Sequence, residues 1–307
     1  MELLSTRQAF GEELLELMRK EERIFALTAD LGESLKMLKV QEEFPHRFLD
    51  TGVAEANMAG VAAGLALGGF VPVAGTFAVF LARAFDHIRL QICQNNLHVI
   101  FVGSHGGVSN AADGGSAHAL EDIAYMRALP NMTIVNPIDY FETKKALVAL
   151  SKIPGPAYLR LYREPTAVIT KEEDEFVMGK ARVLQSGSDI TLIATGPQVA
   201  AALEAAKILK EKNVEAEVIA IHTIKPLDIE AITGSVSKTK KVITVEDHSI
   251  NGGLGSAVAE VLAENGLGKM SRLGLKQFGE SGNYSELVKK VGIDVESIVA
   301  EALKMII

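Results

Sequence analysis

Residues 48–76 read FLDTGVAEANMAGVAAGLALGGFVPVAGT, and this stretch decides the fold class. Residues 48–50 and 71–76 are short and apolar, which is typical of strands in a sheet covered on both faces. Between them, the small residues at 54–69 predict a helix that packs unusually close to a neighbour. A strand, a helix and a second strand in this order form one βαβ unit of a parallel sheet.

The same alternation of strands and helices extends outward from this unit. Further strands are expected at 24–28, 99–104, 132–137 and 156–163, and helices at 5–20 (capped by Ser5 or Thr6), 80–96, 119–128 and 140–151. Residues 164–178 lose the alternation and predict a linker, after which the pattern resumes. We therefore expect an α/β protein with two doubly wound domains and mostly parallel sheets, over residues 1–170 and 180–307.

The composition excludes several classes of protein. A net charge of -8 argues against a nucleic-acid-binding surface, because binding phosphates requires clustered Lys and Arg. The single cysteine, Cys93, allows no internal disulfide, and no zinc-ligand spacing is present. No apolar run reaches the roughly 18 residues of a membrane span, and the acidic amphipathic N-terminus is unlike a signal peptide. We expect a cytoplasmic protein with no membrane or nucleic-acid partner and no metal ligands of its own.

A carboxylate stands at the start of the small-residue helix. Glu55 follows DTGVA, where the helix dipole favours a negative charge, so helix capping alone could explain it. The small residues behind it permit packing that would bury the carboxylate, and a buried carboxylate is suited to acid–base work. Phe77 and Phe80 are either core residues or a wall on which a flat heteroaromatic ring stacks. Arg83 adds charge to an otherwise apolar helix.

A glycine-rich loop, HGGVSNAADGGSAHA, follows the strand at 99–104. Loops at the carboxyl ends of parallel strands bind ligands in α/β folds, and this one carries His105, Asp113 and His118. Histidine is the side chain best suited to move protons near neutral pH. At the end of another strand, Arg160 and Arg163 offer the bidentate fork that suits a phosphate, and the sequence leaves open which of them binds it.

Several other features carry no functional assignment. The turn NGGLG at 251–255 could hold an anion at a helix start, but a tight turn with close packing is the favoured interpretation. His222, Asp247 and His248 stand at strand ends of the second domain, and for all three a structural role is favoured.

The order of these motifs resembles the transketolase family. The resemblance is carried by ADLGES, DTGVAEANMAGVAAGLAL, GTFAVFLARAFDHIR, SHGGV, DGGSAH, EDIAYMRALPNM and YLRLYR, and by the tail from GSDITLIATGPQ to VEDHSINGGLG. It spans nearly the whole chain. It implies a pyrimidine-binding thiamine-diphosphate domain followed by a transketolase C-terminal-like domain.

The resemblance also implies roles for individual residues. Glu55 matches the glutamate that hydrogen-bonds N1′ of the aminopyrimidine ring of thiamine diphosphate, and thereby favours the tautomer that removes the thiazolium proton. Phe80, with Phe77 beside it, matches the aromatic wall against that ring. The other matching positions line the cofactor (Asp30, Leu31, Arg83), grip a sugar phosphate (Ser34, His105, Arg160) or face the sugar hydroxyls (Asp113, His118), with His105 and His118 as further catalytic candidates. Arg83 departs from the tyrosine often found in transketolase and looks more like 1-deoxyxylulose-5-phosphate synthase.

The resemblance implies a partner as well. Full-length members begin with a domain that binds magnesium and the diphosphate and is marked by GDG, which this sequence lacks. A separate N-terminal subunit would supply the GDG motif and the Mg²⁺ ligands, in an α2β2 assembly where two copies of this chain pair through the small-residue helix. The implied reaction transfers a two-carbon ketol unit from a ketose phosphate to an aldose phosphate. The β subunit of a 2-oxo-acid dehydrogenase E1 component, a 1-deoxyxylulose-5-phosphate synthase and a non-catalytic assembly subunit remain as alternatives.

Overall fold

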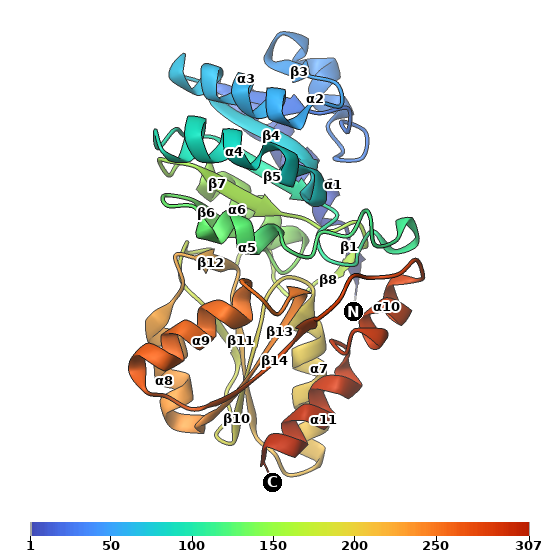
Figure 1. The fold of residues 1–307 in the computed structure, drawn as a ribbon, viewed down its shortest axis with the longest axis vertical. Coiled ribbons are helices and arrows are strands. Elements are labelled where there is room, and N and C mark those ends of the chain that lie inside the picture. The colour runs from blue at the N-terminus through green and yellow to red at the C-terminus, as the bar shows by residue number, and fades with distance from the viewer. Residues whose placement is uncertain (1, 307) are drawn as a thin grey trace.

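The computed structural model describes residues 2–306 and shows two α/β domains, which lie one above the other in Figure 1. The first domain is built on a seven-stranded sheet with the order β12-β6-β7-β5-β4-β2-β3. Six of its strands are parallel: β2 (Ile24–Thr28), β3 (Phe48–Asp50), β4 (Val71–Phe77), β5 (Ile100–Ser104), β6 (Thr133–Val135) and β7 (Ala157–Arg160). Because all six run the same way, the loops that follow them emerge at one edge of the sheet.

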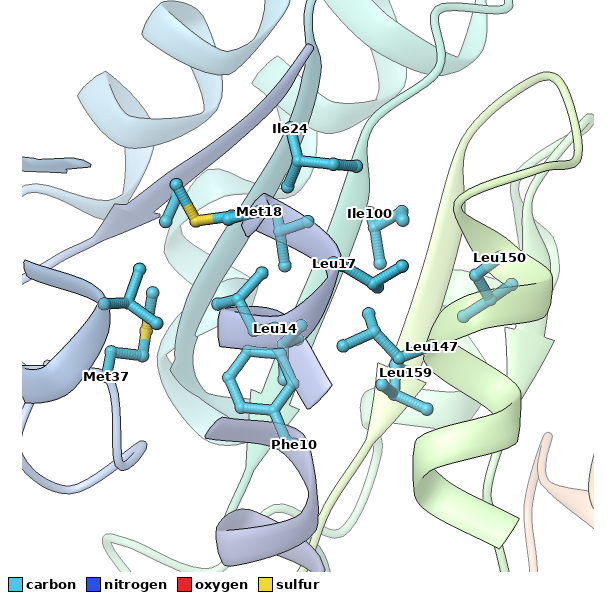
Figure 2. Close-up of a cluster of buried hydrophobic side chains, with 14 of the residues drawn as sticks. Phe10, Leu14, Leu17, Met18, Ile24, Met37, Ile100, Leu147, Leu150 and Leu159 are labelled. Atoms are coloured by element: carbon cyan, nitrogen blue, oxygen red, sulfur yellow. The ribbon is translucent and has the colours of Figure 1, made fainter. Parts of the chain in front are cut away.

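Helices cover both faces of this sheet. One face packs against α1 (Thr6–Lys20), α2 (Leu38–Glu43) and α6 (Tyr140–Leu150), and the other against α3 (Glu55–Leu67), α5 (Asp122–Ala128) and residues 78–93. Figure 2 shows the first of these cores, in which Phe10 and Leu14 of α1 meet Leu147 of α6 over the sheet. All three side chains are fully buried, and each stabilises the fold by about 1.5–3 kcal/mol through removal from water.

The helix ends follow from local sequence. Ser5 caps α1, as predicted, and its side chain accepts a hydrogen bond from the backbone N–H of Gln8. Asp139 caps α6 by accepting from the N–H of Glu142, and the Glu142 carboxylate accepts in turn from the N–H of Ile138 at 2.7 Å. This reciprocal pair satisfies two N–H groups that would otherwise lack partners at the helix start.

The segment at 80–96 is not the single α-helix that its apolar spacing predicts. It consists of a 3₁₀ helix (Ala78–Ala84), one α-helical turn, α4 (Phe85–His87), and a π-helical stretch (Ile88–Cys93). In the π-helical part the N–H of Gln94 donates to the carbonyl of Arg89, five residues back. The wider turn buries Ile88, Ile92 and Cys93 on the same side, and the five residues from Ile88 to Cys93 exceed the three- or four-residue spacing of a regular α-helical stripe.

The second domain has a five-stranded sheet with the order β14-β13-β10-β11-β9. Its parallel strands are β10 (Ile190–Ala194), β11 (Ala216–Ala220), β13 (Lys241–Ser249) and β14 (Lys269–Leu275), and β9 (Arg182–Gln185) is antiparallel to β11. Helices α7 (Gln198–Glu211) and α11 (Val295–Ile306) cover one face, and α8 (Ile229–Thr239) and α9 (Leu254–Asn265) cover the other. The predicted fold class, two doubly wound domains with mostly parallel sheets, is confirmed.

Two pairings are absent from the sequence-based prediction. Strand β12 (Thr223–Lys225) comes from the second half of the chain but pairs antiparallel with β6 of the first sheet. Near the N-terminus, β1 (Leu3–Leu4) pairs with β8 (Thr166–Ala167) of the segment that joins the domains. Among residues 2–306, no helix combines the length and the apolar content that crossing a bilayer requires.

Candidate functional site

The candidate site residues gather at the carboxyl edge of the first sheet. They lie in or next to the loops that follow four neighbouring parallel strands, β3, β2, β4 and β5. These residues are Asp30, Leu31, Ser34, Glu55, Phe77, Phe80, Arg83, His105, Asp113 and His118. Open α/β sheets bind ligands at this edge, so the fold brings the candidates to a chemically sensible place.

Glu55 is a buried carboxylate at the first position of α3. Its side chain is only 4% exposed, and the preceding Ala54 provides no side-chain cap. Arg83 donates to Glu55 Oε1 from Nη1 at 3.3 Å, although the Arg83 side chain is itself 59% exposed. The helix N-terminus favours the negative charge, and its burial limits competition from water. The carboxylate is thus positioned to hydrogen-bond a ligand that covers this edge.

Asp50 holds the backbone around Glu55 and was missed by the sequence analysis. Its Oδ1 accepts from the N–H of Asp30 and from the N–H of Gly52, both at 2.9 Å. Gly52 has φ 68, a left-handed conformation that glycine adopts without strain. An aspartate directly before a Thr-Gly pair is the signature of an Asx turn, and this signal could have identified the residue. Asp50 therefore ties the loop after β2 to the loop after β3.

Three rings stack beside the carboxylate. The ring centroids of Phe77 and Phe80 lie 5.5 Å apart at 14°, and those of Phe77 and His105 lie 3.7 Å apart at 29°. The Arg83 guanidinium carbon lies 4.7 Å from the centroid of Phe80. Both phenyl rings are only half-buried, so they present apolar surface at the edge of the site. Such a surface suits the face of a flat heteroaromatic ring.

The loop after β2 is anchored by Arg7, a second residue that the sequence analysis missed. Arg7 donates from Nη1 to the carbonyl of Ser34 and from Nη2 to the carbonyl of Arg163, both at 2.9 Å. Asp30 is exposed with φ 62, and Leu31 is half-buried with its N–H donating to Thr28 Oγ1. Arg7 thus links Ser34 to the end of β7.

The two histidines are buried and hold neutral rings. Burial, followed by the positive charges of Arg7 and Arg163, lowers the pKa of His105 to about 3. His105 Nδ1 lies 2.9 Å from Ser104 Oγ. Burial also lowers the pKa of His118, whose Nε2 lies 3.4 Å from the carbonyl oxygen of Ala111 and whose buried Nδ1 has no hydrogen-bond partner in the described chain. Near pH 7 both rings can donate or accept hydrogen bonds without carrying charge.

Arg160 does not lie where a phosphate could reach it, which corrects the expectation from the sequence. Its side chain is fully buried and donates to Asp122 from Nε at 2.7 Å and from Nη2 at 3.0 Å. Nη1 donates to Tyr162 Oη, and Nη2 donates also to the carbonyl of Ala119. With these contacts, the Arg160 guanidinium has no pair of adjacent N–H groups left to bind a phosphate. Its role is structural in this chain.

Of the two arginines near the end of β7, Arg163 is the one that faces the loop after β5. Its side chain is 37% exposed and lies 3.3 Å from Asp113 Oδ1. It also donates to Asn110 Oδ1 at 2.9 Å. The pair with Asp113 is accessible to water and hence weak, so an incoming anion can compete for the guanidinium.

The donor set fits the aminopyrimidine end of thiamine diphosphate. A buried carboxylate can hydrogen-bond a ring nitrogen, and the half-buried faces of Phe77 and Phe80 can stack on the ring. Within residues 2–306, no three His, Cys, Asp or Glu side chains group in a way that could hold a metal ion.

The NGGLG turn of the second domain is already occupied by a side chain. The Glu246 carboxylate accepts from the N–H groups of Leu254 and Gly255, each at 2.7 Å, where an external anion would otherwise bind. This agrees with the interpretation of the turn as a packing feature. His222, Asp247 and His248 are buried, each no more than 1% exposed.

Comparisons with known proteins identify relatives over nearly the whole chain. Residues 2–167 match the family description "Transketolase, pyrimidine binding domain", and residues 179–298 match "Transketolase, C-terminal domain". The chain is 45% identical to a putative transketolase C-terminal section from Methanocaldococcus jannaschii, covering 97% of this chain and 95% of that relative. It is 41% identical to a 6-deoxy-6-sulfo-D-fructose transketolase subunit from Clostridium sp. (strain MSTE9), covering 96% and 92%. A solved structure described as a split-gene transketolase, an inactive β4 tetramer, is similar with a TM-score of 0.92 and 39% identity, covering 99% and 98%.

Proposed function

This chain belongs to the transketolase family and is homologous over nearly its whole length to C-terminal subunits of split transketolases, and on that premise we propose that it transfers a two-carbon ketol unit together with a separate N-terminal subunit. The donor would be a ketose phosphate and the acceptor an aldose phosphate. The observation that carries the proposal is Glu55, a carboxylate 4% exposed, beside the stacked rings of Phe77, Phe80 and His105.

Thiamine diphosphate, when bound, supplies the carbanion chemistry that breaks and forms the carbon–carbon bond. Glu55 would hold a proton between its carboxylate and a pyrimidine ring nitrogen. Phe77 and Phe80 would orient the ring by stacking and would exclude water from one face. Asp30, Leu31 and Arg83, at the same edge of the sheet, would line the cofactor.

The loop after β5 and the end of β7 would bind the sugar phosphate. His105 and His118, both neutral near pH 7, would donate or accept hydrogen bonds at the sugar or at its phosphate. Asp113 would face the sugar hydroxyls and Ser34 the phosphate. Arg163 takes the phosphate role that the sequence first offered to Arg160, because only Arg163 is accessible.

The loop chemistry favours sugars over the small oxo acid that the alternative dehydrogenase activity requires. Residues 105–118 carry two imidazoles, one carboxylate, two Ser and one Asn side chain, a set that pairs with hydroxyl groups. One relative is described as a transketolase subunit for 6-deoxy-6-sulfo-D-fructose, so members of the family differ in the anionic group of their sugar. Pentose phosphates, as in the pentose phosphate pathway, are the substrates that we propose to test first.

The partner would complete the cofactor site. A homologous split-gene transketolase is described as an inactive β4 tetramer, which supports the need for a second kind of subunit. We expect that subunit to carry the GDG motif, the Mg²⁺ ligands and the diphosphate site, in a cytoplasmic α2β2 assembly. The small-residue helix α3 is the candidate contact between two copies of this chain; Val53 just before it is 72% exposed and Leu67 at its end is 75% exposed.

Reconstitution tests the proposed reaction. The chain would be mixed with a GDG-bearing partner, thiamine diphosphate and Mg²⁺, and supplied either with xylulose 5-phosphate and ribose 5-phosphate or with pyruvate and a lipoyl acceptor. Ketol transfer with the sugars and none with pyruvate is the expected outcome. Turnover of pyruvate alone would assign the chain to a 2-oxo-acid dehydrogenase, and no turnover of either would favour a non-catalytic assembly subunit.

A further inference from the structure

The loop that carries both candidate histidines is held from the second domain. Residues 105–118 lie beside the segment that precedes α10 (Tyr284–Lys290), although more than 150 residues separate them along the chain (Figure 1). Two groups of contacts join the loop to the second domain. One is the side chain of Asp247 at the end of β13, and the other is the segment 279–281.

Asp247 is fully desolvated against the backbone of the loop. Its Oδ1 accepts from the N–H of Val108 at 2.9 Å, and Tyr284 Oη lies 3.5 Å from Oδ2. A Cβ atom on Gly107 would lie 2.1 Å from Asp247 Cγ, so only glycine allows this close approach. On the other side of the turn, a Cβ on Gly106 would lie 2.7 Å from the Arg160 guanidinium. The Gly106–Gly107 turn therefore packs between two buried charged side chains, Asp247 on one side and Arg160 on the other.

The backbone of this loop contains residues in uncommon conformations. His105 has φ 62 and Ala111 has φ 46, left-handed conformations that residues other than glycine adopt infrequently. Such conformations persist where the surrounding contacts over-determine them. Here the neighbouring hydrogen bonds of Gly106 to Leu161 and of Gly107 to Ala119 come from the first domain, and that of Val108 comes from the second.

The segment 279–281 contacts the other end of the loop. Ser281 Oγ donates to the carbonyl of Ala112 at 2.5 Å. A Cβ on Gly279 would lie 2.3 Å from His118 Nδ1, which places the backbone of Gly279 directly against that ring. The carbonyl oxygen of Gly279 would meet a Cβ on Gly115 at 2.4 Å. The second domain thus touches the loop near both histidines.

We propose that Asp247 is a positioning residue for the substrate loop, and that with the segment 279–281 it makes the second domain a support for the sugar site. Asp247 accepts a hydrogen bond from the N–H of Val108 and so holds the turn that follows His105. The backbone of Gly279 packs against the ring of His118 and so determines where that ring lies. This inference rests on the proposed function, in which the two imidazoles contact the sugar phosphate.

The test compares three variants of the chain assembled with its partner subunit. Asp247→Ala removes the acceptor of the Val108 N–H, and we expect the KM of the sugar phosphates to rise about tenfold, the factor that one such hydrogen bond accounts for. Asp247→Asn keeps an acceptor oxygen at the same place and should restore KM to within about twofold. Glu246→Ala is the matched control: it is equally buried and also accepts from backbone N–H groups, but these belong to α9. It should lower the unfolding temperature and leave KM unchanged.

A second pair of variants covers the case in which Asp247→Ala does not fold. Gly279→Ala pushes a methyl group toward His118 and should raise KM, whereas a Cβ on the nearby Gly282 meets only Leu287, at 3.4 Å. Gly282→Ala should therefore behave as the wild type. Equal KM values for these two variants would overturn the proposal.

Amide hydrogen exchange over residues 105–118 gives a readout that does not depend on activity. Asp247→Ala should accelerate exchange of the Val108 amide about tenfold, and Glu246→Ala should not. Unchanged exchange and unchanged KM in Asp247→Ala, or an equal rise of KM in Glu246→Ala, would contradict the proposal. If the wild-type pair transfers no ketol unit, the proposed function fails, and exchange alone then decides whether Asp247 holds the loop.

Discussion

Replacing Glu55 by Gln separates a catalytic carboxylate from a helix cap. The substitution keeps the size of the side chain and removes its charge at the first position of α3. If Glu55 serves only the helix, the variant should lose a little stability and no activity. If it exchanges a proton with a pyrimidine ring, activity should fall by far more than stability does.

The structure sets the size of the stability loss. The carboxylate contributes about 0.3–1 kcal/mol through the helix dipole. Its ion pair with Arg83 adds about 0–1 kcal/mol, because the Arg83 side chain is 59% exposed and solvent screens the pair. A positioned acid–base group contributes about 10²–10⁴ in rate. At 1.36 kcal/mol for each factor of ten, that is about 2.7–5.4 kcal/mol in the activation barrier.

The assay measures kcat of the assembled enzyme and the unfolding free energy of the same preparations. Glu230→Gln is the matched control, because Glu230 also stands in the first turn of a helix, α8, and pairs with Lys180 at 3.3 Å, yet is 90% exposed. We expect similar small stability losses in both variants, and a loss of turnover only in Glu55→Gln. Near-normal turnover of Glu55→Gln would show that Glu55 serves only the start of the helix.

Four further substitutions have defined outcomes. Arg160→Met should lower the unfolding free energy by about 3–5 kcal/mol, measured by denaturant titration, because it leaves Asp122 buried and unpaired. Arg163→Met should leave stability unchanged and raise the KM of phosphorylated sugars, measured by steady-state kinetics. Burial raises the pKa of Glu142 from 4.5 to about 8, so its contribution to stability is present below pH 4.5 and is lost as the pH rises through 8. Urea unfolding across that range should show a smaller loss in Glu142→Gln than in the wild type. Leu14→Ala should lower the unfolding free energy by about 2–5 kcal/mol without changing kcat of the folded enzyme, and an activity loss at equal folded fraction would count against its purely structural role.

Local patterns were sufficient for most of the fold. Ser5 and the apolar spacing after it predict α1, and apolar runs predict the strands at 24–28 and 71–76, the second of which extends to Phe77 in the structure. The mixed helix at 78–93 could not be predicted in this way, because its π-helical turn depends on what the buried side must meet in the second core. The three-residue strand β12 pairs across the domain boundary, and no local signal specifies such a partner.

The candidate site was predictable to the extent that its residues follow strands. Glu55 and His105 follow β3 and β5, and Phe77 is the last residue of β4; parallel strands bring such positions to one edge. Arg160 was misplaced because its partner Asp122 is 38 residues away in the sequence, so nothing local distinguishes a buried ion pair from a phosphate fork. The contacts of Asp247 with the loop are still more remote, since 139 residues separate it from Val108.

We propose that this chain holds one half of a cofactor site whose other half belongs to a partner. The measurement that tests it most directly is ketol transfer during titration of a fixed amount of this chain with a GDG-bearing N-terminal subunit, in saturating thiamine diphosphate and Mg²⁺. We expect no activity from either protein alone and a linear rise that levels off at one partner per chain. Full activity of this chain without the partner, or a plateau independent of this chain, would contradict it.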